Sequence, residues 1–225
     1  MDHNTIVNIL IGYLCFVPLI TLHEWAHAWV AWKCGDNTAY NDGRVTMNPV
    51  AHMELIGTVV LPLMASFVAV KSPALAGFII GWGRPVPVNS ANLRRPRVDD
   101  TLVTVAGPTM NFIIAFALIG LIKVLAVSGA ASTNDLGGGV IETCVRTAAM
   151  SLGLCFFNLI PIPPLDGSHI LKNLIGMDQI TYYRFAQYGL LAVILVMNFV
   201  PAVPAAIGWA IKVSLQLMLT FFHLR

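Results

Sequence analysis

The chain has 225 residues, of which 57% are hydrophobic and 11% are charged, and its net charge is +2. An average soluble domain is about 25% charged, so a chain this apolar cannot cover a surface that faces water, and several segments are expected to face lipid. The small net charge argues against a nucleic-acid partner, and the four cysteines, which lack C-x-x-C spacing, indicate neither a disulfide framework nor a thiolate metal site.

Apolar runs long enough to cross a bilayer follow one another along the chain. Because a spanning helix needs about 20 apolar residues, they predict an all-α polytopic membrane protein with about five to six transmembrane helices. No linker is long enough for a separate soluble domain, so residues 1–225 are expected to form a single membrane domain. The start of the chain lacks a basic signal-peptide region, so the first run is expected to remain in the mature protein. The runs cover residues 5–22 with 28–32, then about 55–70, a shorter 74–83, 101–127, 140–160, 185–200 and 204–222.

The linkers between these runs are rich in turn residues. In the linker 35–49, residues 44–47 alternate like a short strand, and residues 83–98 resemble an extended segment that leads into a basic loop. Residues 128–139 are small and polar, as in a flexible turn. The sequence therefore predicts short β segments in the linkers.

An H-E-x-x-H motif, His23 to His27, lies at the end of the first run. On a helix, residues four apart share a face, so both imidazoles can reach one metal ion. Glu24 would lie beside the metal and can take a proton from a bound water, whose pKa zinc lowers to about 7. The alternative is a chance pentapeptide with both histidines packed in the core. A charge inside an apolar helix costs on the order of 3 kcal/mol, which favours the metal site.

Catalytic zinc usually has three protein ligands, so a third ligand is expected elsewhere in the chain. Asp166 is the favoured candidate, because it follows three prolines between residues 161 and 164 that break the fourth helix. Irregular backbone at membrane depth is tolerated only when it is buried in protein or lines a wet cavity. His169 and the pair of His52 and Glu54 stay open as alternatives, although a loop-packing or solvated role is expected for His52.

Two further motifs complete a resemblance to a known family. Residues 106–111 are A-G-P-T-M-N, and residues 158–167 contain N-L-I-P followed by L-D-G. Together with H-E-x-x-H, in this order, they resemble the site-2 proteases, the zinc metalloproteases of regulated intramembrane proteolysis. The segments 43–49 (GRVTMNP) and 83–89 (GRPVPVN) are similar to a compact bacterial subgroup without PDZ or CBS domains.

The resemblance implies roles for individual residues of the site. For Asn158 it suggests that the side chain positions substrate or stabilises an oxyanion. A hydrogen bond to the carbonyls freed at the helix end is an equally weighted alternative for this residue. Close helix packing is the expected role of Gly107 and Pro108, and an interhelical hydrogen bond is the safer expectation for Asn111. The main implication is one zinc ion per chain, with Glu24 as the catalytic base and three ligands, His23, His27 and Asp166.

The ligands must meet at one depth, which constrains the topology. The helices that end near His27 and Asp166 are expected to run in the same direction, with an odd number of crossings between them. Residues 55–82 are therefore expected to enter and leave the membrane on one side, as a re-entrant element or a short helical pair. Residues 33–100 then lie in the cytoplasm, as the positive-inside rule favours. The expected setting is a bacterial plasma membrane, with an outward N-terminus and an active site toward the cytoplasm.

The predicted function is hydrolysis of peptide bonds in membrane-spanning substrates within the bilayer. The substrate helix is expected to unwind and to pair with an edge segment near 44–47 or 84–89. One rival is another H-E-x-x-H membrane protease with Glu or His as third ligand, and another is a catalytically silent zinc-binding scaffold or transporter. The sequence leaves the substrate, the regulators and the oligomeric state open.

Overall fold

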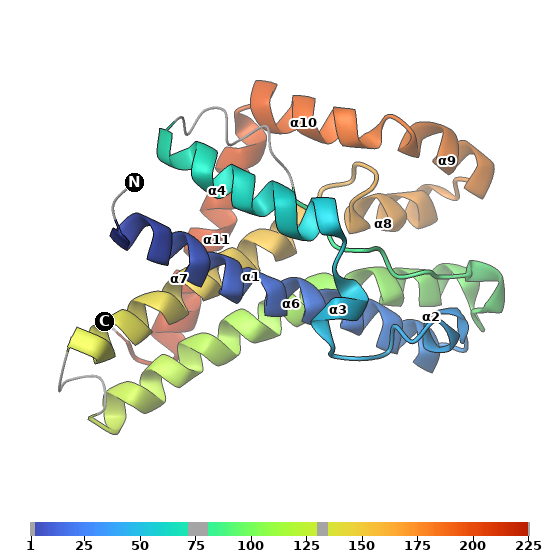
Figure 1. Cartoon of the computed structure of the whole chain (residues 1–225). Helices are drawn as coiled ribbons and strands as arrows, with labels where there is room; N and C mark the ends of the chain where they lie inside the picture. Colours follow the sequence, from blue (N-terminus) through green and yellow to red (C-terminus); the bar gives the residue numbers. More distant parts are fainter. Residues whose placement is uncertain (1–2, 72–80, 130–134, 225) are drawn as a thin grey trace.

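The computed structural model describes residues 3–71, 81–129 and 135–224, and helices make up most of these ranges (Figure 1). Most of the expected run 74–83 lies outside them. The elements are, in chain order, α1 (His3–Lys33), α2 (Thr38–Asn41), α3 (Pro49–His52), the π-helical η1 (Leu55–Val60), α4 (Leu61–Lys71), the 3₁₀ turn η2 (Ser90–Asn92), α6 (Pro96–Val127), α7 (Asp135–Asn158), α8 (Asp166–Ile175), α9 (Gln179–Ala186), α10 (Gly189–Phe199) and α11 (Ala202–Phe221).

Four of the described helices are long and apolar enough to cross a membrane, namely Thr5–Lys33, Pro96–Val127, Gly138–Asn158 and Ala202–Phe221. The pair α9 and α10, bent by 55°, makes a fifth candidate, whereas Leu55–Val68 is shorter. Large apolar side chains on these helices, such as Leu14, Val124 and Trp209, are more than 60% exposed, as expected of surfaces that face lipid. The predicted all-α polytopic class is confirmed, and the described residues give four or five candidate spans where about five to six were expected.

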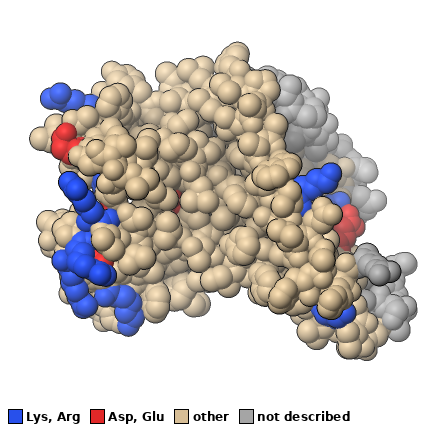
Figure 2. All heavy atoms as spheres, turned by 180° about the vertical axis from the view of Figure 1, so that it is seen from behind, with Lys and Arg blue, Asp and Glu red and all other residues tan. Residues whose placement is uncertain are grey.

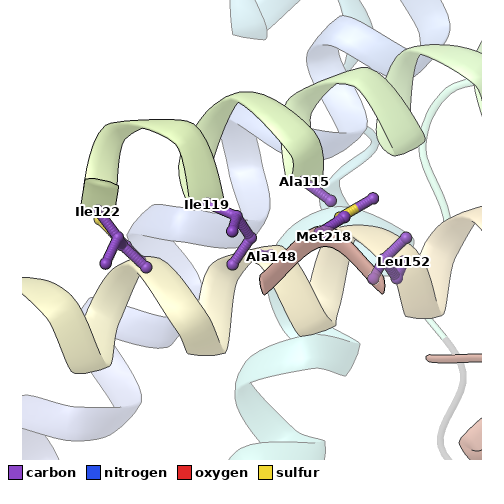
Figure 3. Close-up of a cluster of buried hydrophobic side chains, with 7 residues drawn as sticks. Ala115, Ile119, Ile122, Ala148, Leu152 and Met218 are labelled. Carbon is purple, nitrogen blue, oxygen red and sulfur yellow. The ribbon is translucent and has the colours of Figure 1, made fainter. Parts of the chain in front are cut away.

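The main apolar core lies where α6, α7 and α11 meet (Figure 3). Ile119 of α6 is fully buried and lies over Ala148 of α7, whose small side chain lets the two helices approach closely. Met218 of α11 packs against the residues that α6 and α7 contribute to this core. A smaller cluster of Ala31, Leu93 and Val103 joins α1 to α6. The central helix α6 is thereby fixed against α1 on one side and α7 on the other.

The helix directions match the topological expectation. In Figure 1, α1 and α7 run toward the same end of the molecule, and α6, which packs against both, runs the opposite way. Gly57 and Trp82, near the two ends of the segment 55–82, lie side by side, since the amide of Trp82 donates to the carbonyl of Gly57 over 3.0 Å. Two ends that lie side by side agree with an element that enters and leaves on one side.

No β-strand forms within the described ranges, so the short β segments expected at 44–47 and within 83–98 are absent there. Instead, polar side chains hold residues 83–92, here called the strap. The buried Arg44 donates to the carbonyls of Arg84 and Pro85. At the other end, the buried Asp36 accepts from the amide of Asn89 over 2.7 Å. The alternating pattern at 44–47 thus belongs to a loop whose arginine points inward.

Basic side chains gather at one end of the molecule in Figure 2, the end where α2, α8 and α9 lie in Figure 1. Fewer lie at the opposite end. The segments at the first end carry Lys33, Arg44, Arg84, Arg94, Arg95, Arg97, Lys172 and Arg184.

Candidate metal centre

Two histidines of α1 form one side of the site. His23 and His27 are one helical turn apart and only 6% and 7% exposed. Their Nε2 atoms are 3.0 Å apart. The i, i+4 spacing of the motif therefore brings both imidazoles to one point, as the sequence predicts.

Asp166 completes the cluster from the start of α8. The chain between α7 and α8 is irregular, and it passes close to Gly167, the second residue of α8, where an added Cβ would lie 2.2 Å from the Leu159 carbonyl oxygen. The carboxylate Oδ2 of Asp166 lies 3.3 Å from Nε2 of His23 and 3.4 Å from Nε2 of His27. Among the described residues, these three form a group whose ligand atoms lie close enough together to hold a metal ion.

The geometry of the three atoms fits a zinc ion. A tetrahedral ion with ligands at about 2.1 Å holds those ligands roughly 3.4 Å apart, close to the spacings of this cluster. Among the described residues, the buried Oδ2 of Asp166 has no hydrogen-bond partner. A buried carboxylate oxygen that faces two imidazole nitrogens matches the donor set that binds zinc.

Helix α6 orients both imidazoles from behind. Nδ1 of His27 lies 2.7 Å from the carbonyl oxygen of Val103, which can only accept, so Nδ1 holds the proton and Nε2 presents its lone pair. Nδ1 of His23 lies 3.0 Å from the side-chain amide of Asn111. Among the described residues, Oδ1 of Asn111 is buried without a partner. Rotating this amide by 180° turns Oδ1 toward His23 as an acceptor and frees Nε2 of His23 in the same way.

Gly107 makes room for the two rings. A Cβ added at this position would lie 2.3 Å from Nε2 of His27 and 2.6 Å from Nε2 of His23. Any larger residue would occupy the space beside the ligand atoms. The helix packing expected of Gly107 is therefore a direct contact with the candidate metal centre.

Glu24 lies on the side of α1 that faces the strap. Its side chain is half-buried, and its Oε1 is 3.4 Å from the position that a Cβ on Gly83 would take. The backbone of Gly83 therefore passes directly beside the predicted base. Arg44 holds this backbone in place through the next two carbonyls.

The other candidate residues make contacts of their own. Asn158 ends α7, and its Nδ2 donates to the Leu154 carbonyl over 2.9 Å, which is the helix-end bond considered as an alternative. His52 is fully buried and contacts the Thr46 carbonyl through Nε2, in a loop-packing role. His169 packs edge-on against Tyr182.

Glu54 caps η1 by accepting from the amide of Gly57. Neither Glu54 nor His52 nor His169 belongs to the candidate metal group that His23, His27 and Asp166 form in the described part of the chain. The sequence missed the Val103 carbonyl, since a backbone acceptor leaves no signature. Asn111 carried a weak signal, because it follows Gly107 by one helical turn and so shares its face.

Comparison with known proteins places this site in a family. The model of "Peptidase family M50" matches residues 120–201, which include Asn158 and Asp166. A Bacillus subtilis protein, provisionally named zinc metalloprotease YwhC, is 36% identical over 168 residues, covering 74% of this chain and 70% of that protein. The chain belongs to peptidase family M50. This confirms the resemblance to site-2 proteases, and the chain is a multi-pass membrane metalloprotease.

A second M50 relative is longer than this chain. The Mycobacterium tuberculosis (strain Erdman) protein, provisionally named zinc metalloprotease Rip2, is 30% identical over 169 residues, and the match covers 74% of this chain and 56% of that protein. The names of both M50 relatives imply zinc as the metal. No solved structure shows a significant match to the chain.

Proposed function

We propose that this chain is an intramembrane zinc endopeptidase that cuts membrane-spanning substrates, with one zinc ion held by His23, His27 and Asp166. The observation that carries the proposal is the convergence of three ligand atoms, from α1 and from the start of α8, within 4.8 Å of one another. Both α1 and the helix that precedes α8 are candidate membrane spans. A metal site between two such spans is suited to peptide bonds that lie in lipid.

Aromatic residues at the end of α1 support a site below the membrane surface. Trp32 stacks on Tyr40 with ring centroids 5.3 Å apart, and the Lys33 ammonium lies 4.2 Å from the Trp32 ring centroid. Tryptophan, tyrosine and lysine are typical of the boundary between lipid and water. His23 and His27 precede Lys33 by six to ten residues, or about 9–15 Å along the helix.

The residues of the site divide the chemistry among them. A bound zinc ion supplies a Lewis acid for the scissile carbonyl and lowers the pKa of water to about 7. Glu24 takes the proton of the attacking water on its carboxylate and delivers it to the nitrogen of the leaving amine. Val103 and Asn111 hold the two imidazoles in the tautomer that keeps Nε2 free. The side-chain amide of Asn158 donates one hydrogen to the Leu154 carbonyl, and its second hydrogen is the donor available to a substrate oxyanion.

The strap offers a place for an unwound substrate. The amide of Arg84 donates to the His52 carbonyl over 2.9 Å, and its own carbonyl accepts from Arg44. In an extended chain, the neighbouring residue turns its backbone groups to the opposite side. Within the described ranges the backbone amide and carbonyl of Gly83 have no partner, so they can pair with an added strand beside Glu24.

The charge distribution supports a cytoplasmic orientation. Most basic residues belong to loops and helices at the end of the molecule where α1 ends and α8 lies (Figure 2). Under the positive-inside rule this end faces the cytoplasm of a bacterial plasma membrane. The N-terminus then faces outward, and Asp166 approaches the site from the cytoplasmic side.

The test is cleavage in proteoliposomes that contain the full chain and a panel of single-span membrane proteins. The wild type should cleave at least one of them, lose activity with a chelator and regain it with zinc. Glu24→Gln should retain stoichiometric zinc and cleave nothing. Glu142→Gln is the matched control, since Glu142 is a 62% exposed glutamate of α7 and its loss should leave cleavage unchanged.

Cleavage by Glu24→Gln would remove Glu24 from the mechanism. A zinc-loaded wild type that cleaves no member of the panel would instead support the silent scaffold or transporter.

A further inference from the structure

A buried ion pair joins α8 to α6 away from the candidate metal centre. The Lys172 ammonium lies 3.0 Å from Oδ2 of Asp100, and both side chains are only 6% exposed. The side-chain amide of Asn173 donates to the same carboxylate oxygen over 2.8 Å and to Oγ1 of Thr101 over 3.1 Å. Two consecutive residues of α8 are therefore anchored on two consecutive residues of α6.

This anchor lies on the same two helices as the metal centre. Lys172 follows Asp166 by six residues of α8, or about 9 Å along the helix. On α6, Asp100 precedes Val103, the partner of His27, by one turn. One turn of α6 therefore contacts His27 through Val103. The adjacent turn contacts α8, the helix that carries Asp166, through Asp100. The distance between Asp166 and the imidazoles depends on how α8 sits along α6.

Apolar packing by itself holds α8 weakly. Leu174 and Ile175 on this helix are 79% and 60% exposed. The segment before α8 is irregular, so it does not fix the position of α8 through a continuous helix. Nδ1 of His169 also faces the Asp100 carboxylate, at 3.8 Å from Oδ2, whereas the Ser168 hydroxyl lies 2.8 Å from that of Tyr182 in α9. The Asp100 carboxylate, with Lys172 as its buried charged partner, is therefore the centre of the described polar contacts between α8 and α6.

We propose that Asp100 and Lys172 are positioning residues of the metal centre, which set α8 on α6 so that Asp166 meets both imidazoles. The inference rests on the proposed role of Asp166 as a ligand. Lys172 is six residues from Asp166 and touches neither the metal nor the substrate. Its contribution should therefore appear in zinc affinity before it appears in the chemistry of cleavage.

Zinc affinity of the purified, detergent-solubilised full chain tests this, measured by competition with a chromophoric chelator alongside thermal unfolding. Lys172→Met should weaken zinc binding about 10–100-fold, the usual effect of losing a residue that supports a ligand. Asn173→Ala, a milder change, should weaken it less. The double variant Asp100→Asn with Lys172→Met removes both charges and should recover part of the affinity.

Ile119→Ala is the control, because it cuts the core between α6 and α7 without touching α8. It should lower the melting temperature and leave zinc affinity unchanged. Wild-type affinity in both Lys172→Met and Asn173→Ala would overturn the positioning role while leaving the metal centre intact. An equal loss of affinity in Ile119→Ala would also overturn it, since the effect would then follow stability alone. A wild-type chain that binds no zinc would overturn the metal centre itself.

Discussion

Replacing Gly107 with alanine should disrupt the metal centre, although alanine has the higher helix propensity and would by itself stabilise α6. The added Cβ would lie 2.3 Å from Nε2 of His27, whereas carbon and nitrogen atoms in contact sit roughly 3.5 Å apart. The ring or the helix must therefore move by about 1 Å, and metal–ligand distances tolerate only about 0.2 Å. Zinc sites bind with about 10–16 kcal/mol, or roughly 3–5 kcal/mol for each of three or four ligands. Loss of one imidazole should weaken zinc binding at least about 100-fold.

The assay is a zinc titration of the purified chain against a competing chelator, with the melting temperature of the metal-free form measured in parallel. Gly208→Ala is the matched control, because Gly208 lies inside α11 and a Cβ there meets nothing within 4 Å. Alanine stabilises a helix interior by roughly 0.5–1 kcal/mol relative to glycine, so the control should melt slightly higher and retain its zinc affinity. Wild-type zinc affinity in Gly107→Ala would refute the close packing of α6 against both imidazoles.

Three further variants test the surroundings of the site. Asn111→Leu removes the partner of His23 and should weaken zinc binding about 10–100-fold, and an unchanged titration would dismiss this role. Arg44→Met removes the charged donor of the Arg84 and Pro85 carbonyls, and such hydrogen bonds contribute about 1–3 kcal/mol. Hydrogen exchange at the Arg84 amide should rise roughly 5–150-fold with zinc content unchanged, and equal exchange would show that Arg44 does not hold the strap. Burial lowers the pKa of His52 below its ordinary value of about 6.5, so the folded chain resists its protonation. Stability should decline as pH falls below about 6.5, and His52→Gln should flatten melting curves measured between pH 5 and 8.

The sequence predicted that His23, His27 and Asp166 lie together because its signals are local. The spacing of His23 and His27 defines one helix face, and the prolines before Asp166 mark the break that lets α8 start beside them. Gly107 was expected to pack helices closely, and the structure adds what it packs against. Each of these residues carries its information in a short stretch of chain.

The surroundings of the ligands could not be predicted, since they depend on contacts between distant segments. Arg44 alternates with apolar neighbours like a strand residue, but its partners lie 40 residues away in the strap. The anchor between Asp100 and Lys172 joins residues 72 positions apart. Without the arrangement of α6 and α8, both charged residues resemble ordinary solvated ones.

X-ray absorption at the zinc edge of the purified chain tests the central claim most directly, because it identifies the atoms bound to the metal. The account predicts stoichiometric zinc with two imidazole nitrogens and oxygen ligands at about 2.0–2.2 Å, and loss of the metal in Asp166→Ala. Sulfur at about 2.3 Å, or an unchanged spectrum in Asp166→Ala, would contradict it.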